Sequence, residues 1–303
     1  MSFGDGGLLL LGASGYIGKK LRATFTAMNV RATYCRSAFP NGIRFDATRT
    51  RIADIVERDH EISHCLILLG DTRLDSCARD VAASTRVNID GIKRVIDDLY
   101  EFGIFPIFAS SDNVFDGSTG DYTETDPPSP IGVYGRQKLE IEKFLATRGD
   151  DHLILRFTKV YGDDLDDGTM FTAWLKSLLA GETITVATDQ VLSPVFIDDV
   201  MAAIERLIET AATGIFHIAG PMAASRAELL DDMLSEGQEF LPKNPQVQRC
   251  RINDLGLLEQ RPLKVSLSAE KLVRHTGIDL TGPAEVIRRV FENARQAGVL
   301  KVS

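Results

Sequence analysis

Short apolar runs alternate with longer amphipathic segments through the first half of the chain. The runs with a strand pattern are residues 8–12, 30–35, 43–46, 65–70, 104–110 and 152–157. The segments with a helical pattern are residues 16–28, 48–59, 76–102 and 134–148. Two of the strand runs, LLLLG and CLILLG, are almost entirely apolar, which is typical of strands covered on both faces. Buried strands that alternate with helices predict a doubly wound α/β domain with a parallel sheet.

The alternation changes after residue 158. The pattern there predicts a helix over 169–180, short strands within 183–197, a helix over 198–211, a strand over 215–219 and a mostly helical segment over 220–303. No repeat or low-complexity linker separates this part from the first, so we expect an appended lobe with the chain crossing between the two. The sequence therefore predicts a Rossmann domain of residues 1–160, with 190–219 returning to it, and a smaller C-terminal substrate-binding lobe of residues 161–189 and 220–303.

The composition is that of an ordinary globular protein. Of the 303 residues, 44% are hydrophobic and 25% are charged, and the formal net charge is −9. This charge argues against a nucleic-acid partner, because binding to phosphate backbones needs a basic face. No apolar run approaches the roughly 18 residues of a membrane-spanning helix, so no membrane partner is expected.

Neither the N-terminus nor the cysteines indicate secretion or metal binding. The first residues, MSFGDGG, lack the basic region, apolar core and cleavage site of a secretory signal. The four cysteines, Cys35, Cys65, Cys77 and Cys250, are not spaced like metal ligands, and we interpret them as reduced thiols. The sequence therefore predicts a cytoplasmic protein without a metal site.

A glycine-rich segment, LLLLGASGYIGKK, lies between the first predicted strand and the first predicted helix. In such a loop one glycine makes the turn, one lets the backbone approach a pyrophosphate and one allows close packing of helix and strand. The helix N-terminus then points its N–H groups and the positive end of its dipole at the phosphates. A simple turn is the alternative for a lone glycine pattern, but the position at the start of a βα unit favours dinucleotide binding. The residues predicted to contact the cofactor here are Gly12, Ser14, Gly15, Tyr16, Ile17 and Gly18.

The end of the second predicted strand, ATYCRSAFP, indicates which cofactor binds. An acidic residue there would bond to the ribose hydroxyls of NAD, but this chain has Arg36 and Ser37. A guanidinium holds a 2′-phosphate with two hydrogen bonds, and the serine donates another. NADPH is therefore the favoured cofactor, and NAD is the alternative if Arg36 is only a solvated loop residue. Asp46, after the third strand, is placed either to accept a hydrogen bond from the adenine amino group or to cap the helix predicted over 48–59.

Three polar side chains are candidates for catalysis. Ser111 ends the strand run IFPIFASS, at the carboxyl edge of the sheet where α/β proteins bind ligands. Tyr134 and Lys138, in VYGRQKLEIEKF, are four residues apart and therefore share one face of a helix. Surface decoration is the alternative for this spacing alone. Together with the glycine loop and a serine at a strand end, the pair favours a site for hydride transfer.

The three residue types suit the reduction of a carbonyl group. When hydride reaches the carbonyl carbon, the oxygen becomes an alkoxide, and the phenol of Tyr134 can give it a proton. The Lys138 ammonium stabilises the phenolate that is left and can also bond to the nicotinamide ribose. Ser111 donates a hydrogen bond to the developing oxyanion.

These motifs together resemble the extended short-chain dehydrogenase/reductase superfamily. Within it, the segments SSDNVFDG, TDPPSPIGVYGRQKLEIEKF, LILRFTKVYGDD, DQVLSPVFIDDV and GIFHIAG are similar, in this order, to the dTDP-4-dehydrorhamnose reductase family. The resemblance covers roughly residues 8–280. It implies a Rossmann domain, a smaller lobe that binds a nucleotide sugar, and an NAD(P)H-dependent reduction of a 4-keto sugar, and a homodimer is expected by analogy with the family.

The resemblance assigns roles by position. Ser111, Tyr134 and Lys138 match the catalytic residues of the family, and Asn88 matches the asparagine in the helix before the catalytic strand. The residues implied in substrate binding are Ser111, Asp112, Asn113 and Arg261, the last in an Arg-Pro pair of the C-terminal lobe. Asn113 replaces an aromatic residue of the usual STDYVFDG, and no Glu follows Asp112, which argues against the sugar 4,6-dehydratases of the superfamily.

Two other functions stay open at the level of the sequence. One is a sugar-nucleotide epimerase of the same superfamily, which keeps its cofactor bound and recycles the hydride. The other is a non-catalytic, NADP-binding regulatory subunit, because the chain is also similar to the regulatory β-subunit of methionine adenosyltransferase. The intact Ser111, Tyr134 and Lys138 argue against lost chemistry. The predicted function is therefore an NADPH-dependent reductase of a nucleotide-linked 4-keto-6-deoxysugar.

Overall fold

The computed structural model describes residues 6–25, 29–58 and 61–300. The chain forms two compact units. The first unit contains Met1–Phe115, Pro127–Phe157 and Met201–Phe216, and the second contains Asp116–Asp126, Thr158–Val200 and His217–Ser303. The role of the second unit as a substrate-binding lobe stays a prediction.

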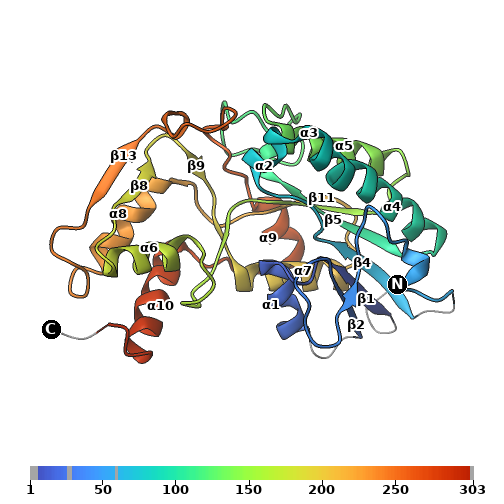
Figure 1. Ribbon diagram of the computed structural model, residues 1–303, viewed down its shortest axis with the longest axis horizontal. Helices are drawn as coiled ribbons and strands as arrows, with labels where there is room; N and C mark the ends of the chain where they lie inside the picture. The colour runs from blue at the N-terminus through green and yellow to red at the C-terminus, as the bar shows by residue number, and fades with distance from the viewer. Residues whose placement is uncertain (1–5, 26–28, 59–60, 301–303) are drawn as a thin grey trace. The chain divides into compact units, whose positions relative to one another are not determined.

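A seven-stranded sheet forms the core of the first unit (Figure 1). Its strands are β1 (Gly7–Leu11), β2 (Val30–Tyr34), β3 (Ile43–Arg44), β4 (Ile62–Ile67), β5 (Phe105–Ser111), β6 (Leu153–Phe157) and β11 (Gly214–Ile218), in the spatial order β11-β6-β5-β4-β1-β2-β3. The register aligns Leu10 with Leu66, Leu66 with Ile107 and Ile107 with Leu153 in parallel ladders. The predicted doubly wound α/β fold is confirmed, and the order reverses between β1 and β4, where such sheets bind ligands.

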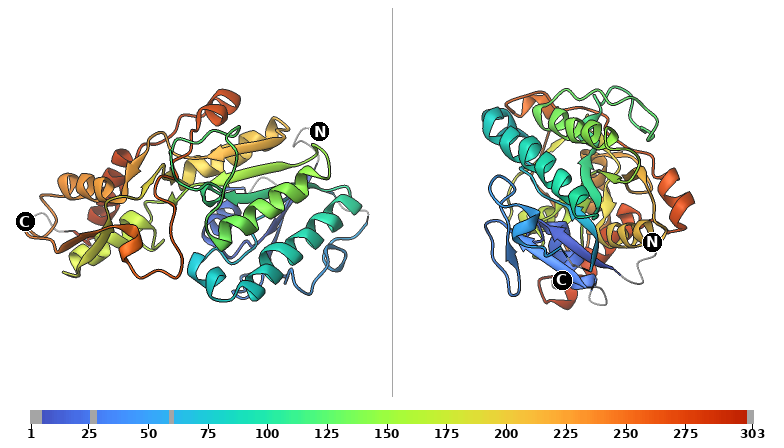
Figure 2. Two further views of the ribbon diagram at one scale, coloured as in Figure 1. Left: turned by 90° about the horizontal axis from the view of Figure 1, so that it is seen from above. Right: turned by 90° about the vertical axis from the view of Figure 1, so that its right-hand side faces the viewer.

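Helices cover both faces of this sheet. In the first unit they are α1 (Tyr16–Thr24), α2 (Leu74–Arg79), α3 (Val81–Thr85), the π-helix η3 (Arg86–Gly91), α4 (Ile92–Glu101) and α5 (Val133–Ala146), and α7 (Ile197–Glu209) contributes its C-terminal part. Figure 1 shows α4 and α5 on one face and α1 on the other, and in Figure 2 α4 and α5 run side by side. The buried residues of α4, which include Ile92, Val95, Ile96 and Leu99, follow the helical period and pack on the apolar strands.

The helix predicted over 48–59 is wrong for the described residues, which end at 58 in this segment. Only the short 3-10 helix η2 (Ile52–Asp54) forms. The N–H of Ile52, which in an α-helix would bond to the carbonyl of Thr48, instead donates to the Asp98 carboxylate at 3.0 Å. Arg51 also donates to Asp98, which is 3% exposed. The buried Asp98 carboxylate on α4 therefore takes the N–H that an α-helix in this segment would need.

The helix predicted over 76–102 is interrupted. Asp80, with φ −133° and ψ 81°, ends α2 and caps α3, because its side chain accepts a hydrogen bond from the N–H of Ala83 at 2.8 Å. The next segment is the π-helix η3, which has a wider turn than an α-helix and contains Asn88. Such irregular turns are frequent at functional sites. The predicted helix 16–28 becomes α1, and residues 26–28 lie outside the described part.

The second unit contains the remaining elements. They are β7 (Val160–Tyr161), α6 (Met170–Leu179), β8 (Ile184–Ala187), β9 (Val191–Leu192), β10 (Val195–Phe196), β12 (Ala224–Ser225), α8 (Arg226–Glu236), β13 (Val247–Cys250), η5 (Ile252–Asp254), α9 (Glu270–Thr276) and α10 (Pro283–Gln296). The strand β13 was not predicted, because its polar sequence VQRC becomes a strand only by pairing with β8. Within the described ranges, no helix combines the length and apolarity needed to cross a bilayer.

Replacing Asp98 by alanine should lower the free energy of unfolding by about 1–3 kcal/mol, because the buried N–H of Ile52 loses its acceptor. Urea unfolding measures the change. The control is Glu101→Gln, at the end of the same helix, where an exposed carboxylate pairs with Arg58 at 3.1 Å. Exposed pairs of this kind contribute little, so equal losses in the two variants would contradict this role of Asp98.

Candidate active site

The loop that joins β1 to α1 has the geometry of a phosphate-binding turn. Gly12 has a φ of +89°, a conformation that favours glycine, and a Cβ there would lie 3.0 Å from the carbonyl oxygen of Leu68. A Cβ on Gly18 would lie 2.6 Å from the Cα of Ala13, so α1 approaches the loop closely only because position 18 is glycine. A Cβ on Gly15 would meet only the carbonyl oxygen of Gly12, at 3.5 Å. The backbone at position 15 is therefore open to a ligand.

The start of α1 suits a negatively charged group. Gly15 is the N-cap and offers no side chain to the first N–H groups of the helix. The helix begins at Tyr16, so Ser14, Tyr16 and Ile17 lie at this N-terminus, where the helix dipole favours anions. The structure thus brings the six predicted residues of the loop together in one turn, and their geometry fits a pyrophosphate.

Arg36 and Ser37 follow the carboxyl end of β2 directly, and both are exposed. The Arg22 guanidinium lies 3.6 Å above the ring of Phe39 in the loop that follows, which adds a cation to this corner of the fold. The exposed guanidinium and hydroxyl fit a phosphate group on the adenosine ribose. Recognition of the 2′-phosphate of NADPH by Arg36 stays a prediction.

Asp46 lies in a turn and does not cap the helix predicted after it. Its Oδ1 accepts hydrogen bonds from the Thr48 N–H at 2.9 Å and from the Thr48 hydroxyl at 2.7 Å. The hydrogen bond from the Thr48 hydroxyl holds the pKa of Asp46 below its usual value. The capping role is therefore wrong, since no helix follows, and a contact with adenine stays a prediction.

Tyr134 and Lys138 lie on the buried face of α5 and are only 7% and 4% exposed. The Lys138 ammonium donates a hydrogen bond to the carbonyl oxygen of Ala109 in β5 at 2.6 Å. It also lies 4.6 Å from the ring centre of Phe108 and 5.6 Å from that of Tyr134. The ammonium is therefore held between α5 and β5, with the phenol of Tyr134 as its neighbour.

Ser111 ends β5 beside two further polar side chains. Its hydroxyl donates to the Asp112 carboxylate at 2.8 Å and accepts from the N–H of Asn113 at 3.2 Å, which caps the 3-10 helix η4 (Asp112–Val114). The Asn113 amide also donates to Asp112, at 2.7 Å. A Cβ on Gly135 would lie 2.0 Å from the carbonyl oxygen of Asn113. The backbones of α5 and η4 thus touch, which places Ser111 and Tyr134 close together.

Burial and nearby charges set the protonation of the two residues on α5. Burial raises the pKa of Tyr134, the Asp112 carboxylate raises it further, and a hydrogen bond with Ser111 opposes the rise. Burial also lowers the pKa of Lys138 to about 8, against the opposing charge of Glu142. The phenol is therefore protonated at neutral pH, and the lysine titrates in the range where a change of pH alters its charge.

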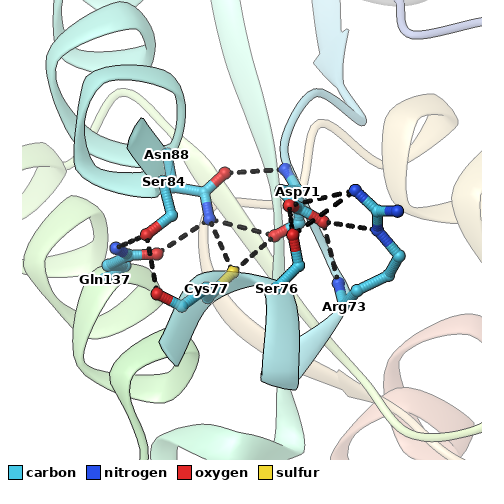
Figure 3. Close-up of polar contacts among 7 residues, drawn as sticks. All are labelled: Asp71, Arg73, Ser76, Cys77, Ser84, Asn88 and Gln137. Carbon is cyan, nitrogen blue, oxygen red and sulfur yellow. Dashed lines mark hydrogen bonds and ion pairs between the residues drawn. The ribbon is translucent and has the colours of Figure 1, made fainter. Parts of the chain in front are cut away.

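A hydrogen-bond network ties α5 to the loop after β4 (Figure 3). The side-chain amide of Asn88 binds both polar backbone atoms of Asp71, accepting from its N–H at 2.8 Å and donating to its carbonyl oxygen at 3.0 Å. The same amide donates to Gln137 Oε1 at 2.8 Å, and Gln137 Nε2 donates to the Ser84 hydroxyl at 2.8 Å. Gln137 lies between Tyr134 and Lys138 in the sequence, so the network fixes α5 against η3 and the β4 loop.

The Asp71 side chain is held at the same place by its own loop. Its carboxylate accepts from Arg73 Nε at 3.1 Å and from the Ser76 hydroxyl (Figure 3). Burial alone would raise the pKa of Asp71, but the hydrogen bonds from Arg73 and Ser76 lower it. The loop after β4 therefore carries an ionised carboxylate close to the candidate site.

Arg261 belongs to the second unit, whereas the other predicted site residues belong to the first. Its N–H donates to Asn253 Oδ1 at 2.8 Å, and Nη1 lies 3.8 Å from Oε1 of Glu259. The side chain of Arg261 is 10% exposed. Its role in binding a sugar nucleotide stays a prediction.

Comparison with known protein families identifies the family of this chain. A family model described as the RmlD substrate binding domain matches residues 6–296. The chain belongs to the RmlD substrate-binding domain family. It is thereby placed in the extended short-chain dehydrogenase/reductase superfamily, and the resemblance that the motifs carry is confirmed.

Proteins with different names are similar to this chain. The dTDP-4-dehydrorhamnose reductase of Sinorhizobium fredii is 29% identical over 253 residues, which are 80% of this chain and 84% of that protein. The β-subunit of methionine adenosyltransferase 2 of Rattus norvegicus is 25% identical over 290 residues, 86% of this chain and 85% of that protein. The crystal structure of dTDP-4-dehydrorhamnose reductase from Bacillus anthracis in complex with NADP has a TM-score of 0.80 and 21% identity, and the match covers 95% of this chain and 99% of that one. This last likeness shows the fold.

Four buried polar residues have no role predicted from the sequence. They are Ser84, Gln137, Glu142 and Arg156. All four belong to the first unit. The signal for two of them was present, because Gln137 and Glu142 fall on the same helical face as Tyr134 and Lys138, where apolar residues would be expected. The signal for Ser84 and Arg156 lies only in their tertiary contacts.

Replacing Asn88 by leucine, which has a similar volume, should leave the N–H of Asp71 without its acceptor, while the carbonyl oxygen of Asp71 keeps the Cys77 thiol as a donor at 3.2 Å. We expect a loss of about 1–3 kcal/mol in the free energy of unfolding, together with faster hydrogen exchange of the Asp71 amide. Urea unfolding and amide exchange followed by NMR check both. Thr72→Ala, at an exposed position of the same loop, is the control, and exchange at Asp71 that is unchanged in Asn88→Leu would refute the anchoring role.

Proposed function

We propose that this protein is an NADPH-dependent reductase of a nucleotide-linked 4-keto-6-deoxysugar. The observation that carries the proposal is the burial of a phenol, an ammonium and a hydroxyl at the carboxyl end of β5. Tyr134 and Lys138 lie on the inward face of α5, and Ser111 ends the neighbouring strand. The glycine loop and the start of α1, which fit a pyrophosphate, belong to the same unit.

Each residue has a task in this reaction. The bound nicotinamide supplies the hydride. Tyr134 stays protonated because burial raises its pKa, so it holds the proton that the substrate oxygen needs. The Ser111 hydroxyl, which donates to the Asp112 carboxylate in the structure, turns to donate its hydrogen bond to the substrate oxygen as negative charge develops there. The Lys138 ammonium stabilises the phenolate that remains, since a neighbouring positive charge favours the ionised form.

The competing proposal is a binding subunit that keeps the fold and the cofactor but has no turnover. Similarity to a protein named as a subunit of methionine adenosyltransferase 2 favours it. The complete set of Ser111, Tyr134 and Lys138 favours the reductase, because a binding subunit has no need of a proton donor next to an ammonium. An epimerase would use the same residues, but it would retain its cofactor during purification. The nucleotide-sugar partner, the homodimer and the cytoplasmic location belong to the same set of predictions.

Replacing Tyr134 by phenylalanine should lower turnover by a factor of about 10²–10⁴, the scale of a lost proton donor, and leave NADPH affinity nearly unchanged. The assay follows NADPH absorbance with a panel of dTDP- and GDP-linked 4-keto sugars. Tyr100→Phe is the matched control, because its hydroxyl bonds to the carbonyl oxygen of Asp151 at 3.2 Å, away from the glycine loop. If the unaltered protein binds NADPH but does not oxidise it with any sugar of the panel, the result favours the binding subunit. Equal turnover of Tyr134→Phe and the unaltered protein would remove the assigned role.

Replacing Arg36 by alanine should raise the Kd for NADPH about tenfold or more, because charge-assisted hydrogen bonds contribute about 1.5–3 kcal/mol. The Kd for NADH should change little, since NADH lacks the 2′-phosphate. Fluorescence titration with both cofactors measures the two values. Arg31→Ala, at an exposed position of β2, is the control. Equal weakening of both cofactors would show that Arg36 does not read the phosphate.

A further inference from the structure

A pair of opposite charges is buried one helical turn beyond Lys138. Glu142 lies four residues after Lys138 on α5 and is 4% exposed, and Arg156 lies in β6 and is 2% exposed. Nη2 of Arg156 is 2.7 Å from Oε2 of Glu142, and Nε is 3.1 Å from Oε1. Both carboxylate oxygens therefore accept hydrogen bonds from one guanidinium, which fixes their orientation.

Two further groups complete the surroundings of this pair. The Ser110 hydroxyl donates a hydrogen bond to Oε1 of Glu142. The guanidinium carbon of Arg156 lies 5.1 Å from the ring centre of Phe115. Successive side chains of a strand point to opposite faces. Ser110 therefore contacts the buried pair, whereas Ser111 lies in the candidate site. The pair is held by β5, β6 and α5 together.

Fold stability alone does not account for this arrangement. Moving two charges out of water is costly, and replacing a buried ion pair by apolar residues of similar volume is often neutral or stabilising. An apolar pair at positions 142 and 156 would therefore support the fold equally well. What the charges change is the pKa of the ionisable group next to them, the Lys138 ammonium.

Several titratable groups face Lys138. Burial lowers its pKa to about 8, and the charge of Glu142 acts in the opposite direction. The Cys77 thiol on α2 is a further titratable group near it. The Tyr134 ring faces it from the same helix at 5.6 Å. The Asp112 carboxylate acts on Tyr134. Glu142 is therefore the carboxylate with the largest effect on the charge of the lysine.

We propose that Glu142 and Arg156 are positioning residues for Lys138. The negative charge of Glu142 favours the charged form of Lys138. Arg156 orients the Glu142 carboxylate, and its positive charge partly offsets the effect of that carboxylate on the pKa of Lys138. The inference rests on the proposed function, in which Lys138 assists proton transfer. Its electrostatic part, however, is measurable without turnover.

The experiment follows the protonation of Lys138 directly. Protein labelled with ¹³C at lysine Cε is titrated by NMR, and the Lys138 resonance is assigned by its disappearance in Lys138→Met. In the unaltered protein the midpoint should lie at about 8. The variants are Glu142→Gln, Arg156→Met and the double variant Glu142→Leu/Arg156→Met, and Glu140→Gln is the control because its exposed carboxylate pairs with Lys93 on α4.

The variants should shift the midpoint in opposite directions. Glu142→Gln removes the negative charge and leaves the Arg156 cation, so the midpoint should fall by about one pH unit or more. Arg156→Met leaves the Glu142 charge uncompensated, so the midpoint should rise. The double variant, which exchanges the pair for apolar residues and is expected to fold, should also have a lower midpoint than the unaltered protein. The alkaline limb of the pH profile of turnover should move with each midpoint.

The possible results separate the two proposals. An unchanged midpoint in the folded double variant would overturn the positioning role, even if turnover were normal. If a single variant does not fold, the double variant decides. Shifts of the expected sign, with no turnover on any sugar in the unaltered protein, would support the electrostatic role and contradict the proposed reduction.

Discussion

A row of buried polar side chains between α5 and the sheet is the constraint on which the candidate site depends. Tyr134, Lys138 and Glu142 occupy successive turns of one helical face. A buried polar group that lacks a partner costs about 1–3 kcal/mol, so each member of the row must meet a partner at a defined place. Lys138 meets the carbonyl oxygen of Ala109, and Glu142 meets Arg156. The helix is thereby fixed in rotation and in register along β5.

The opposite flank of α5 is fixed by neutral groups. Gln137 accepts a hydrogen bond from the Asn88 amide (Figure 3). The same amide binds both the N–H and the carbonyl oxygen of Asp71, as the backbone of a neighbouring strand would. Helix α5 is thus attached to β5 and β6 by its charged side chains, and to the β4 loop by amides. The glycine loop at β1 is held by β2, because the N–H of Ala13 donates to the carbonyl oxygen of Thr33 at 2.8 Å and the N–H of Gly12 donates to the Thr33 hydroxyl at 3.2 Å.

The sequence was sufficient for the order of strands and helices and for the glycine loop, because these follow from local periodicity and backbone conformation. The pairing of Tyr134 with Lys138 was predictable for the same reason, since four residues are one helical turn. The helix predicted over 48–59 does not form because the carboxylate that takes the N–H of Ile52 belongs to Asp98, 46 residues further along the chain. The burial of Arg156 was equally out of reach, since charged residues are normally exposed and only the folded sheet brings this guanidinium to Glu142.

The contact at Gly135 has a consequence for how the site can vary. Because the main-chain carbonyl of Asn113 in η4 lies against the main chain of α5 at Gly135, the spacing between α5 and the end of β5 is set by backbone atoms, which substitution of side chains leaves in place. Exchange of the Asn113 side chain would remove the hydrogen bond from its amide to Asp112, but it would leave this backbone contact in place. In such an architecture the side chains that line the candidate site can change while the spacing between α5 and β5 is kept.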